Sequence, residues 1–173
     1  MELMIVIVII GILATVGMVM FGGQSEKAKI AASKANLKTI SKWLAVESTN
    51  VCSAKQGRNK NGMFFEDGNY KTWIRCSGDG TSLAYAASHY FHKNVIFKNP
   101  YTGENAIPDK AISSSFNITR SGLETVSSSY VKMGEIMFFN LGGEDMSVVF
   151  SNIGDKNGSD KKEWVIIPGP SNF

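Results

Sequence analysis

MELMIVIVIIGILATVGMVMFGG, residues 1–23, is the stretch that decides the fold of this 173-residue chain. Nearly every side chain from residue 3 to residue 21 is apolar, and as a helix this run would be about 28 Å long. The core of a bilayer is ~30 Å thick, so the run predicts a single membrane-crossing helix. A removable signal peptide fits less well, because the flank at Glu2 is acidic and the run has no small-residue cleavage site.

The helical pattern continues beyond the apolar run, over residues 24–50. Apolar side chains recur there at steps of three and four, which places them on one face of a helix. That face carries Ile30, Leu37, Ile40 and Leu44, with Ala28, Ala31, Ala32 and Ala35 behind them. The opposite side carries Lys27, Lys34, Lys38 and Lys42, which we interpret as a solvated face rather than a lipid- or DNA-binding stripe. Together the two segments predict one helix of ~70 Å.

Three glycines, Gly17, Gly22 and Gly23, lie where the two helical segments meet. Each costs about 1 kcal/mol relative to alanine in a helix interior. We therefore predict that the long helix bends or locally unwinds at this place. The glycines separate a membrane segment, residues 1–23, from the amphipathic segment, residues 24–50.

The remaining residues predict a head with an α+β fold. Within the region 51–129, residues 63–65 and 70–75 have the pattern of short strands, and residues 82–92 have that of a short helix. Within the region 130–173, residues 134–141, 146–153 and 163–167 are β-rich and joined by turn-forming residues, which predicts an antiparallel meander. One face of this sheet would pack against the amphipathic half of the long helix.

The two cysteines, Cys52 and Cys76, both follow the apolar run. In an oxidising compartment such a pair predicts a disulfide, which would stabilise the head by roughly 3 kcal/mol. The alternative is two buried, unpaired thiols. A zinc site is not expected, because no His or Cys cluster supports the pair.

Catalysis has no candidate residues in this sequence. It contains no Ser-His-Asp arrangement, no phosphate-binding loop and no paired carboxylates at helical spacing, so we expect no enzyme. The net charge is only +3, and the aromatic residues are dispersed along the head. They predict core and contact residues rather than a stacking platform for nucleic acid.

The stretch ELMIVIVIIGILA, residues 2–14, resembles the N-terminal motif of type IV pilins and of the pseudopilins of type II secretion. In that family a prepilin peptidase removes a leader, and an N-methylated Phe then begins the mature chain. Here the Phe-Thr-Leu that precedes the family's Glu is absent, and Met1 stands in its place. We expect either that a leader and the first mature residues precede this sequence, or that this member starts differently. The family's helix-breaking Pro is also missing, so the glycines would supply the flexibility.

The resemblance implies a lollipop-shaped fold and a role for the N-terminal helix in assembly. Glu2 would pair with the N-terminal amine of a neighbouring subunit, which offsets the penalty for burying a carboxylate in an apolar bundle. The alternative is an acid at the membrane interface that interacts only with the helix dipole. The side chains expected in the membrane, and later in the filament core, are Leu3, Ile5, Val8, Ile9, Ile12, Leu13, Val16 and Phe21.

The resemblance also suggests a calcium site, because some pseudopilins bind calcium in a C-terminal loop. The segment GDKNGSDKK offers four side-chain oxygen donors, Asp155, Asn157, Ser159 and Asp160. Calcium prefers such oxygen ligands, but the EF-hand spacing is not met and no Glu closes the loop. The favoured interpretation is a polar hairpin turn without a cofactor.

The functional expectation is a structural subunit of a type IV pilus, used in adhesion, motility or DNA uptake. It would be anchored in the cytoplasmic membrane before assembly and lie in an extracellular helical homo-oligomer afterwards. Its partners would be the prepilin peptidase, an inner-membrane assembly platform and an assembly ATPase. The alternatives are a pseudopilin of a type II secretion system and, in another class, a monomeric membrane-tethered binding domain.

Overall fold

The structure is a computed structural model that describes residues 2–52, 62–66, 71–75, 80–94, 96–108, 116–141 and 146–169. Within these helices and strands the side chains of residues 2, 3, 18–22, 50–52, 62–66, 71–75, 80–82, 116, 117 and 146 are not part of the description. The predicted Cys52–Cys76 disulfide therefore lies outside the described residues. It stays a prediction.

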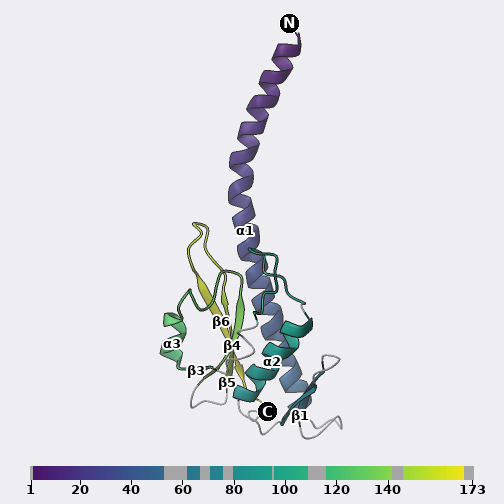
Figure 1. Cartoon of the computed structure of the whole chain (residues 1–173), viewed down its shortest axis with the longest axis vertical. Coiled ribbons are helices and arrows are strands. Elements are labelled where there is room, and N and C mark those ends of the chain that lie inside the picture. Colours follow the sequence, from purple (N-terminus) through teal and green to yellow (C-terminus); the bar gives the residue numbers. More distant parts are fainter. Residues whose placement is uncertain are drawn as a thin grey trace.

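A single helix, α1 (Glu2–Cys52, 51 residues), dominates the shape of the molecule. At the usual rise per residue it is about 77 Å long. Its N-terminal half projects from the head and its C-terminal half lies within the head (Figure 1). The helix continues through Gly17, Gly22 and Gly23 without a break. The long helix is confirmed, whereas flexibility at the glycines stays a prediction.

The head contains the predicted antiparallel meander. It consists of β4 (Ile136–Leu141), β5 (Met146–Asn152) and β6 (Lys162–Pro168). β4 pairs with β5 and β5 pairs with β6, both antiparallel, so that Phe138 lies opposite Val149 and Phe150 opposite Trp164. A fourth strand, β3 (Phe116–Ile118), joins the free edge of β4 in parallel and was not predicted. Three residues are too few to show a period of two.

The region between α1 and the sheet supplies a hairpin and two shorter helices. The two predicted short strands are present as β1 (Gly62–Glu66) and β2 (Lys71–Arg75), and they pair antiparallel with Phe64 opposite Trp73. The predicted short helix is α2 (Gly80–Asn94), which is longer at both ends than expected. Helix α3 (Arg120–Thr125) was not predicted, and the Thr119 hydroxyl caps it by accepting from the Gly122 N–H.

The core of the head forms where α1, α2 and the sheet meet. Helix α1 contributes a buried stripe at steps of three and four, made of Ser33, Leu37, Ile40, Ser41, Leu44 and Ser48. Phe91 of α2 stacks on Phe138 of β4, with ring centroids 6.1 Å apart. All six residues of β4 are buried, so both faces of this strand are covered. Trp43 stacks on Tyr90 at 5.5 Å and so joins the two helices directly.

The prediction that one face of α1 is buried was right for the large apolar side chains and wrong for the alanines. Leu37, Ile40 and Leu44 are buried and Ile30 is half-buried, but the four alanines at positions 28, 31, 32 and 35 are exposed. Serines occupy the remaining places of the buried stripe, and the Ser41 hydroxyl donates to the Leu37 carbonyl at 2.7 Å. A serine that bonds to its own helix can be buried without an outside partner.

Shortening Leu44 to alanine should destabilise the head, because its side chain is fully buried at the centre of the core. We expect Leu44→Ala to lower the free energy of unfolding by about 2–5 kcal/mol. The measurement is denaturant unfolding of the full chain in detergent, followed by tryptophan fluorescence. Val46→Ala is the matched control on the same helical turn, because Val46 is 48% exposed. Equal losses in the two variants would contradict this placement of the core.

Candidate functional site

The most unusual surface of the molecule is the projecting segment, defined here as residues 4–17 of α1. None of its side chains is buried, and all but Gly17 are exposed. The large apolar members are Met4, Ile5, Val6, Ile7, Val8, Ile9, Ile10, Ile12, Leu13 and Val16, with exposed fractions from 51% at Ile9 to 76% at Met4. A helix that is apolar on every side is normally covered on every side. The head covers none of it (Figure 1).

The one polar side chain of the projecting segment is satisfied within the helix. The Thr15 hydroxyl donates to the carbonyl of Ile12 at 2.8 Å and lies 3.3 Å from that of Gly11. It therefore needs no polar partner from outside, and the segment presents an almost uniformly apolar surface. An exposed apolar surface of this extent marks a membrane-binding or protein-binding site.

Six of the residues expected in the membrane and the filament core lie on this surface: Ile5, Val8, Ile9, Ile12, Leu13 and Val16. The side chains of Glu2, Leu3 and Phe21 lie outside the description, so their expected roles stay predictions. Among the side chains that the structure describes, no helix offers an apolar stretch long enough to cross a membrane.

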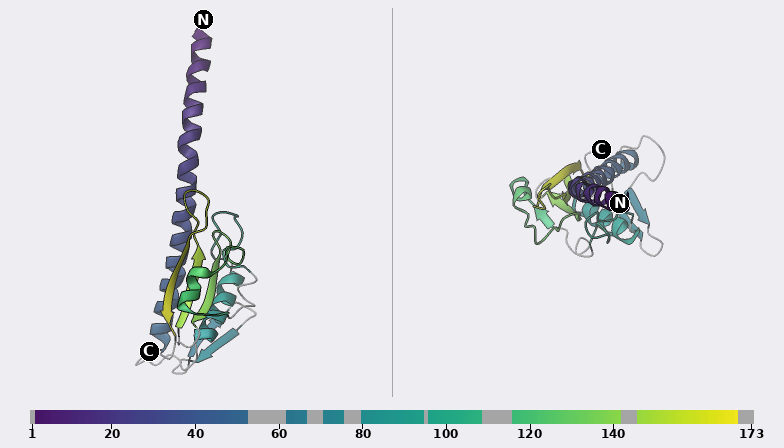
Figure 2. Two further views of the ribbon diagram at one scale, coloured as in Figure 1. Left: turned by 90° about the vertical axis from the view of Figure 1, so that its left-hand side faces the viewer. Right: turned by 90° about the horizontal axis from the view of Figure 1, so that it is seen from above.

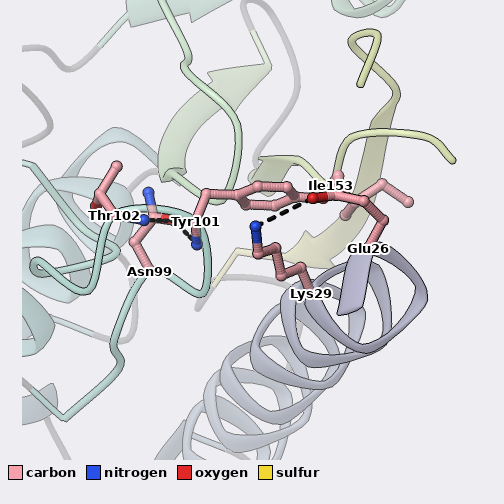
Figure 3. A network of polar contacts seen from close by, with 6 residues as sticks. All are labelled: Glu26, Lys29, Asn99, Tyr101, Thr102 and Ile153. Atoms are coloured by element: carbon pink, nitrogen blue, oxygen red, sulfur yellow. Dashed lines mark hydrogen bonds and ion pairs between the residues drawn. The ribbon is translucent and has the colours of Figure 1, made fainter. Parts of the chain in front are cut away.

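A junction of polar contacts fixes α1 at the point where it leaves the head (Figure 3). Lys29 donates to the Glu26 carboxylate one turn earlier at 3.0 Å, and its ammonium lies 5.5 Å from the centroid of the Tyr101 ring. The Tyr101 hydroxyl donates in turn to the carbonyl of Ile153 at 2.7 Å. Three segments that are far apart in sequence thus meet at one tyrosine: α1, the loop of residues 96–108, and the loop after β5.

Two glycines leave room for this junction. Gly134 and Gly154 have φ angles of +78° and +68°, a region that favours glycine. A Cβ at position 134 would collide with the Asn99 side chain, and one at position 154 would lie 2.5 Å from the Tyr101 hydroxyl. Asn99 uses the space to accept from the Tyr101 N–H at 2.8 Å and to donate to the Met133 carbonyl at 2.9 Å. Asn99 therefore ties the loop to the segment before β4, and the Tyr101 hydroxyl ties it to the segment after β5.

A second contact ties α1 to the far edge of the sheet. Lys34 of α1 lies 2.8 Å from the Glu163 carboxylate of β6. Both side chains are partly exposed, so the pair contributes little stability by itself. Lys27, Lys34, Lys38 and Lys42 are all exposed, as expected for a solvated face. The lysine row was predicted from the sequence, whereas the junction at Tyr101 was not. Pro100 and Gly103 are residues that indicate a loop at this place, but they do not indicate what the loop contacts.

Two of the four proposed calcium donors, the Asp155 and Asp160 carboxylates, are engaged in separate hydrogen bonds within the fold. The Asp155 carboxylate accepts from the backbone N–H groups of Asn157 and Ser159, both at 2.8 Å. The Asp160 carboxylate instead accepts from Ser128 and Asn152, and these two hydrogen bonds lower its pKa. In the described part of the chain no three His, Cys, Asp or Glu side chains gather as a metal site would require. The calcium site stays a weak prediction.

Comparison of the chain with models of known protein families, with curated proteins and with solved structures gives no match. The functional interpretation therefore depends on the residues themselves. The two features that need an explanation are the uncovered projecting segment and the rigid attachment of α1 to the head.

Replacing Tyr101 with phenylalanine tests the junction. Burial is the main cause that raises the pKa of Tyr101 above its usual value of 10.0, and the nearby Glu26 and Asp155 carboxylates add to it. The protonated hydroxyl is favoured in the folded state, so its contribution is complete below pH 10.0 and is lost as the pH rises above this value. We expect Tyr101→Phe to lower the free energy of unfolding by about 0.5–1.5 kcal/mol near neutral pH.

The measurement is denaturant unfolding of both proteins at a series of pH values on either side of 10. Stability of the unmodified chain should fall more steeply at high pH than that of Tyr101→Phe. Parallel pH profiles would show that the hydroxyl is not tied to the fold in this way.

Proposed function

We propose that the protein is a structural subunit of a type IV pilus-like filament, which polymerises through the projecting segment. The observation that supports this most directly is the exposure of residues 4–16 on every side of α1. Covering a single Val, Leu, Ile or Met side chain contributes about 1.5–3 kcal/mol. The ten such side chains of the projecting segment need to be covered, and the described residues of the head leave them exposed, so a membrane or other subunits would have to cover them.

The same surface would serve two environments in succession. Before assembly, lipid tails would cover the projecting segment in the cytoplasmic membrane. After assembly, the projecting segments of other copies would replace the lipid. This exchange is feasible because hydrocarbon and apolar side chains have similar polarity, so helix association in a membrane depends on close packing instead of the hydrophobic effect.

Gly11 supports an assembly role over simple anchoring. Nothing in the described chain lies within 4 Å of the position where a Cβ of residue 11 would stand. The fold of the single subunit therefore gives no steric reason for a glycine that weakens the helix by about 1 kcal/mol. A small residue on an apolar helix allows another helix to approach closely.

The head would form the outer part of the filament. Its connection to α1 consists of the Leu44 side chain buried in the core and of the contacts of Tyr101 and Glu163 with Lys29 and Lys34. Force on the head would reach the projecting segment through continuous helix. The proposed partners are an assembly platform, an assembly ATPase and a prepilin peptidase in the membrane. Electron microscopy of fibres sheared from the cell surface, with mass spectrometry of their subunits, tests the proposal.

A charge in the projecting segment should prevent polymerisation. Ile9→Lys places an ammonium group on a side that would be covered in a filament, and we expect fibres to decrease at least tenfold while the head keeps its unfolding midpoint. The matched control is Ile96→Lys, because Ile96 is equally exposed, at 54% against 51% for Ile9, but lies on the head. Fibre counts by electron microscopy and the melting temperature in detergent are measured. Normal fibres from Ile9→Lys would exclude this assembly surface.

Removal of the acid at the start of the helix should also reduce assembly. Glu2→Ala deletes the proposed partner of a neighbour's N-terminal amine, and we expect a loss of fibres with an unchanged head. Glu124→Ala is the control, because Glu124 is an exposed acid on α3, away from the projecting segment. If the protein is a monomeric tethered domain, Glu2→Ala should leave its behaviour unchanged, and both proteins should be monomeric in detergent. Such a result would favour that alternative over a filament.

A further inference from the structure

The loop between β5 and β6 contains a motif that the filament does not explain. Its residues Asn157, Gly158 and Ser159 form the Asn-x-Ser/Thr signature of an N-glycosylation acceptor. We propose that Asn157 is a glycosylation site that receives an oligosaccharide from a polyprenyl-pyrophosphate carrier. The proposal rests on the function above, because the head must lie on the side of the membrane where such a transfer takes place.

The loop presents Asn157 in an accessible form. Every residue from Lys156 to Lys161 is exposed. Gly158 adopts a φ of +75°, and its N–H donates to the Asp155 carbonyl at 3.1 Å, so the motif forms a turn at the surface. No atom of the described residues lies within 4 Å of where a Cβ of Gly158 would stand. A transferase can therefore approach the tip of this loop without displacing the rest of the head.

Hydrogen bonds to Asp155 hold the backbone of the loop, and they do not involve the side chains of Asn157 and Ser159. The Asp155 carboxylate accepts from the N–H groups of Asn157 and Ser159, which fixes the main chain on either side of Gly158. No hydrogen bond found among the described residues uses the Asn157 amide group or the Ser159 hydroxyl. These are the two groups that the acceptor signature requires, and the fold does not need them elsewhere.

The same signature occurs a second time, at Asn117, Ile118 and Thr119, where the fold uses the hydroxyl group. Asn117 lies within strand β3, opposite Asn140 of β4. The Thr119 hydroxyl of this second motif accepts from the Gly122 N–H at 3.2 Å and caps α3. A transferase that engaged the Thr119 hydroxyl would take this cap from α3. The structure thus separates a motif whose hydroxyl makes no hydrogen bond among the described residues from one whose hydroxyl caps a helix, which the sequence motif cannot do.

The position of the loop also suits a lipid-linked donor. The loop between β5 and β6 reaches up along α1 at the end of the head that faces the projecting segment (Figure 2). The carbonyl of its first residue, Ile153, accepts a hydrogen bond from the Tyr101 hydroxyl, and the Lys29 ammonium lies beside the Tyr101 ring. The helix from Phe21 to Lys29 is about 12 Å long. In the anchored subunit, Asn157 would therefore lie on the membrane-facing side of the head, near the surface where a carrier pyrophosphate resides.

The proposed transfer exchanges one bond for another. The Asn157 Nδ2 attacks C1 of the first sugar, and a C1–N bond forms as the bond between C1 and the phosphate oxygen breaks. The polyprenyl pyrophosphate leaves with the electron pair of that bond. A base of the transferase takes the proton from Nδ2. No oxidant or reductant is required.

The first experiment incubates the purified full chain in detergent with a purified membrane oligosaccharyltransferase and a polyprenyl-pyrophosphate oligosaccharide. Intact-mass and glycopeptide analysis should find one glycan, on Asn157. Asn157→Gln and Ser159→Ala should each reduce the modification at least tenfold, and the control Asn117→Gln should leave it unchanged. No transfer to the folded chain, or transfer to Asn117 in preference to Asn157, would overturn the proposal.

The second experiment separates this proposal from that of the filament. The chain is produced in cells that contain the same transferase and donor, and its glycosylation is measured together with its fibres. A chain that is glycosylated at Asn157 but forms no fibres contradicts the filament and supports the site. A chain that is modified in detergent but not in cells supports the acceptor chemistry and contradicts the exported head on which the filament depends.

Discussion

Burial of one stripe of α1 in the head is the interaction on which the rest of the molecule depends. Leu37, Ile40 and Leu44 are at most 4% exposed, and they join α1 to the sheet and to α2. The same helix continues without interruption into the projecting segment, which the described residues of the head leave exposed. Because the helix is unbroken in this structure, the packing of its lower half also sets the direction of its upper half here. The flexibility predicted at Gly17, Gly22 and Gly23 would loosen this link between the core of the head and the projecting segment.

Polar contacts complete this attachment without stabilising it strongly. The Lys34–Glu163 pair and the Lys29 ammonium are partly exposed, and exposed pairs contribute at most about 1 kcal/mol each. Their role is to position segments relative to one another. Tyr101 joins α1 to two loops at the end of the head that lies next to the projecting segment. The apolar core stabilises the packing of the helix, and the junction fixes these loops against it.

The two proposals assign different work to neighbouring parts of the molecule. The projecting segment would provide the contacts between subunits, which need a uniform apolar surface and a close approach at Gly11. The loop between β5 and β6 would carry a bulky polar group, which needs open space and an ordered backbone. In the second case a carboxylate that looked like a metal ligand in sequence, Asp155, instead accepts from the backbone and shapes the turn.

The sequence by itself determined the elements whose pattern is local. The apolar run, the three- and four-residue steps up to Leu44 and the three β-rich runs predicted α1 and the meander, because hydrophobic periodicity reflects which side of an element faces the core. Tertiary structure alone decided that Ala28, Ala31, Ala32 and Ala35 are exposed, since small apolar side chains fit either environment. It also decided that β3 pairs with β4 and that Tyr101 meets Lys29 and Ile153. These contacts join residues far apart in the chain, and no local pattern records which distant segments will meet.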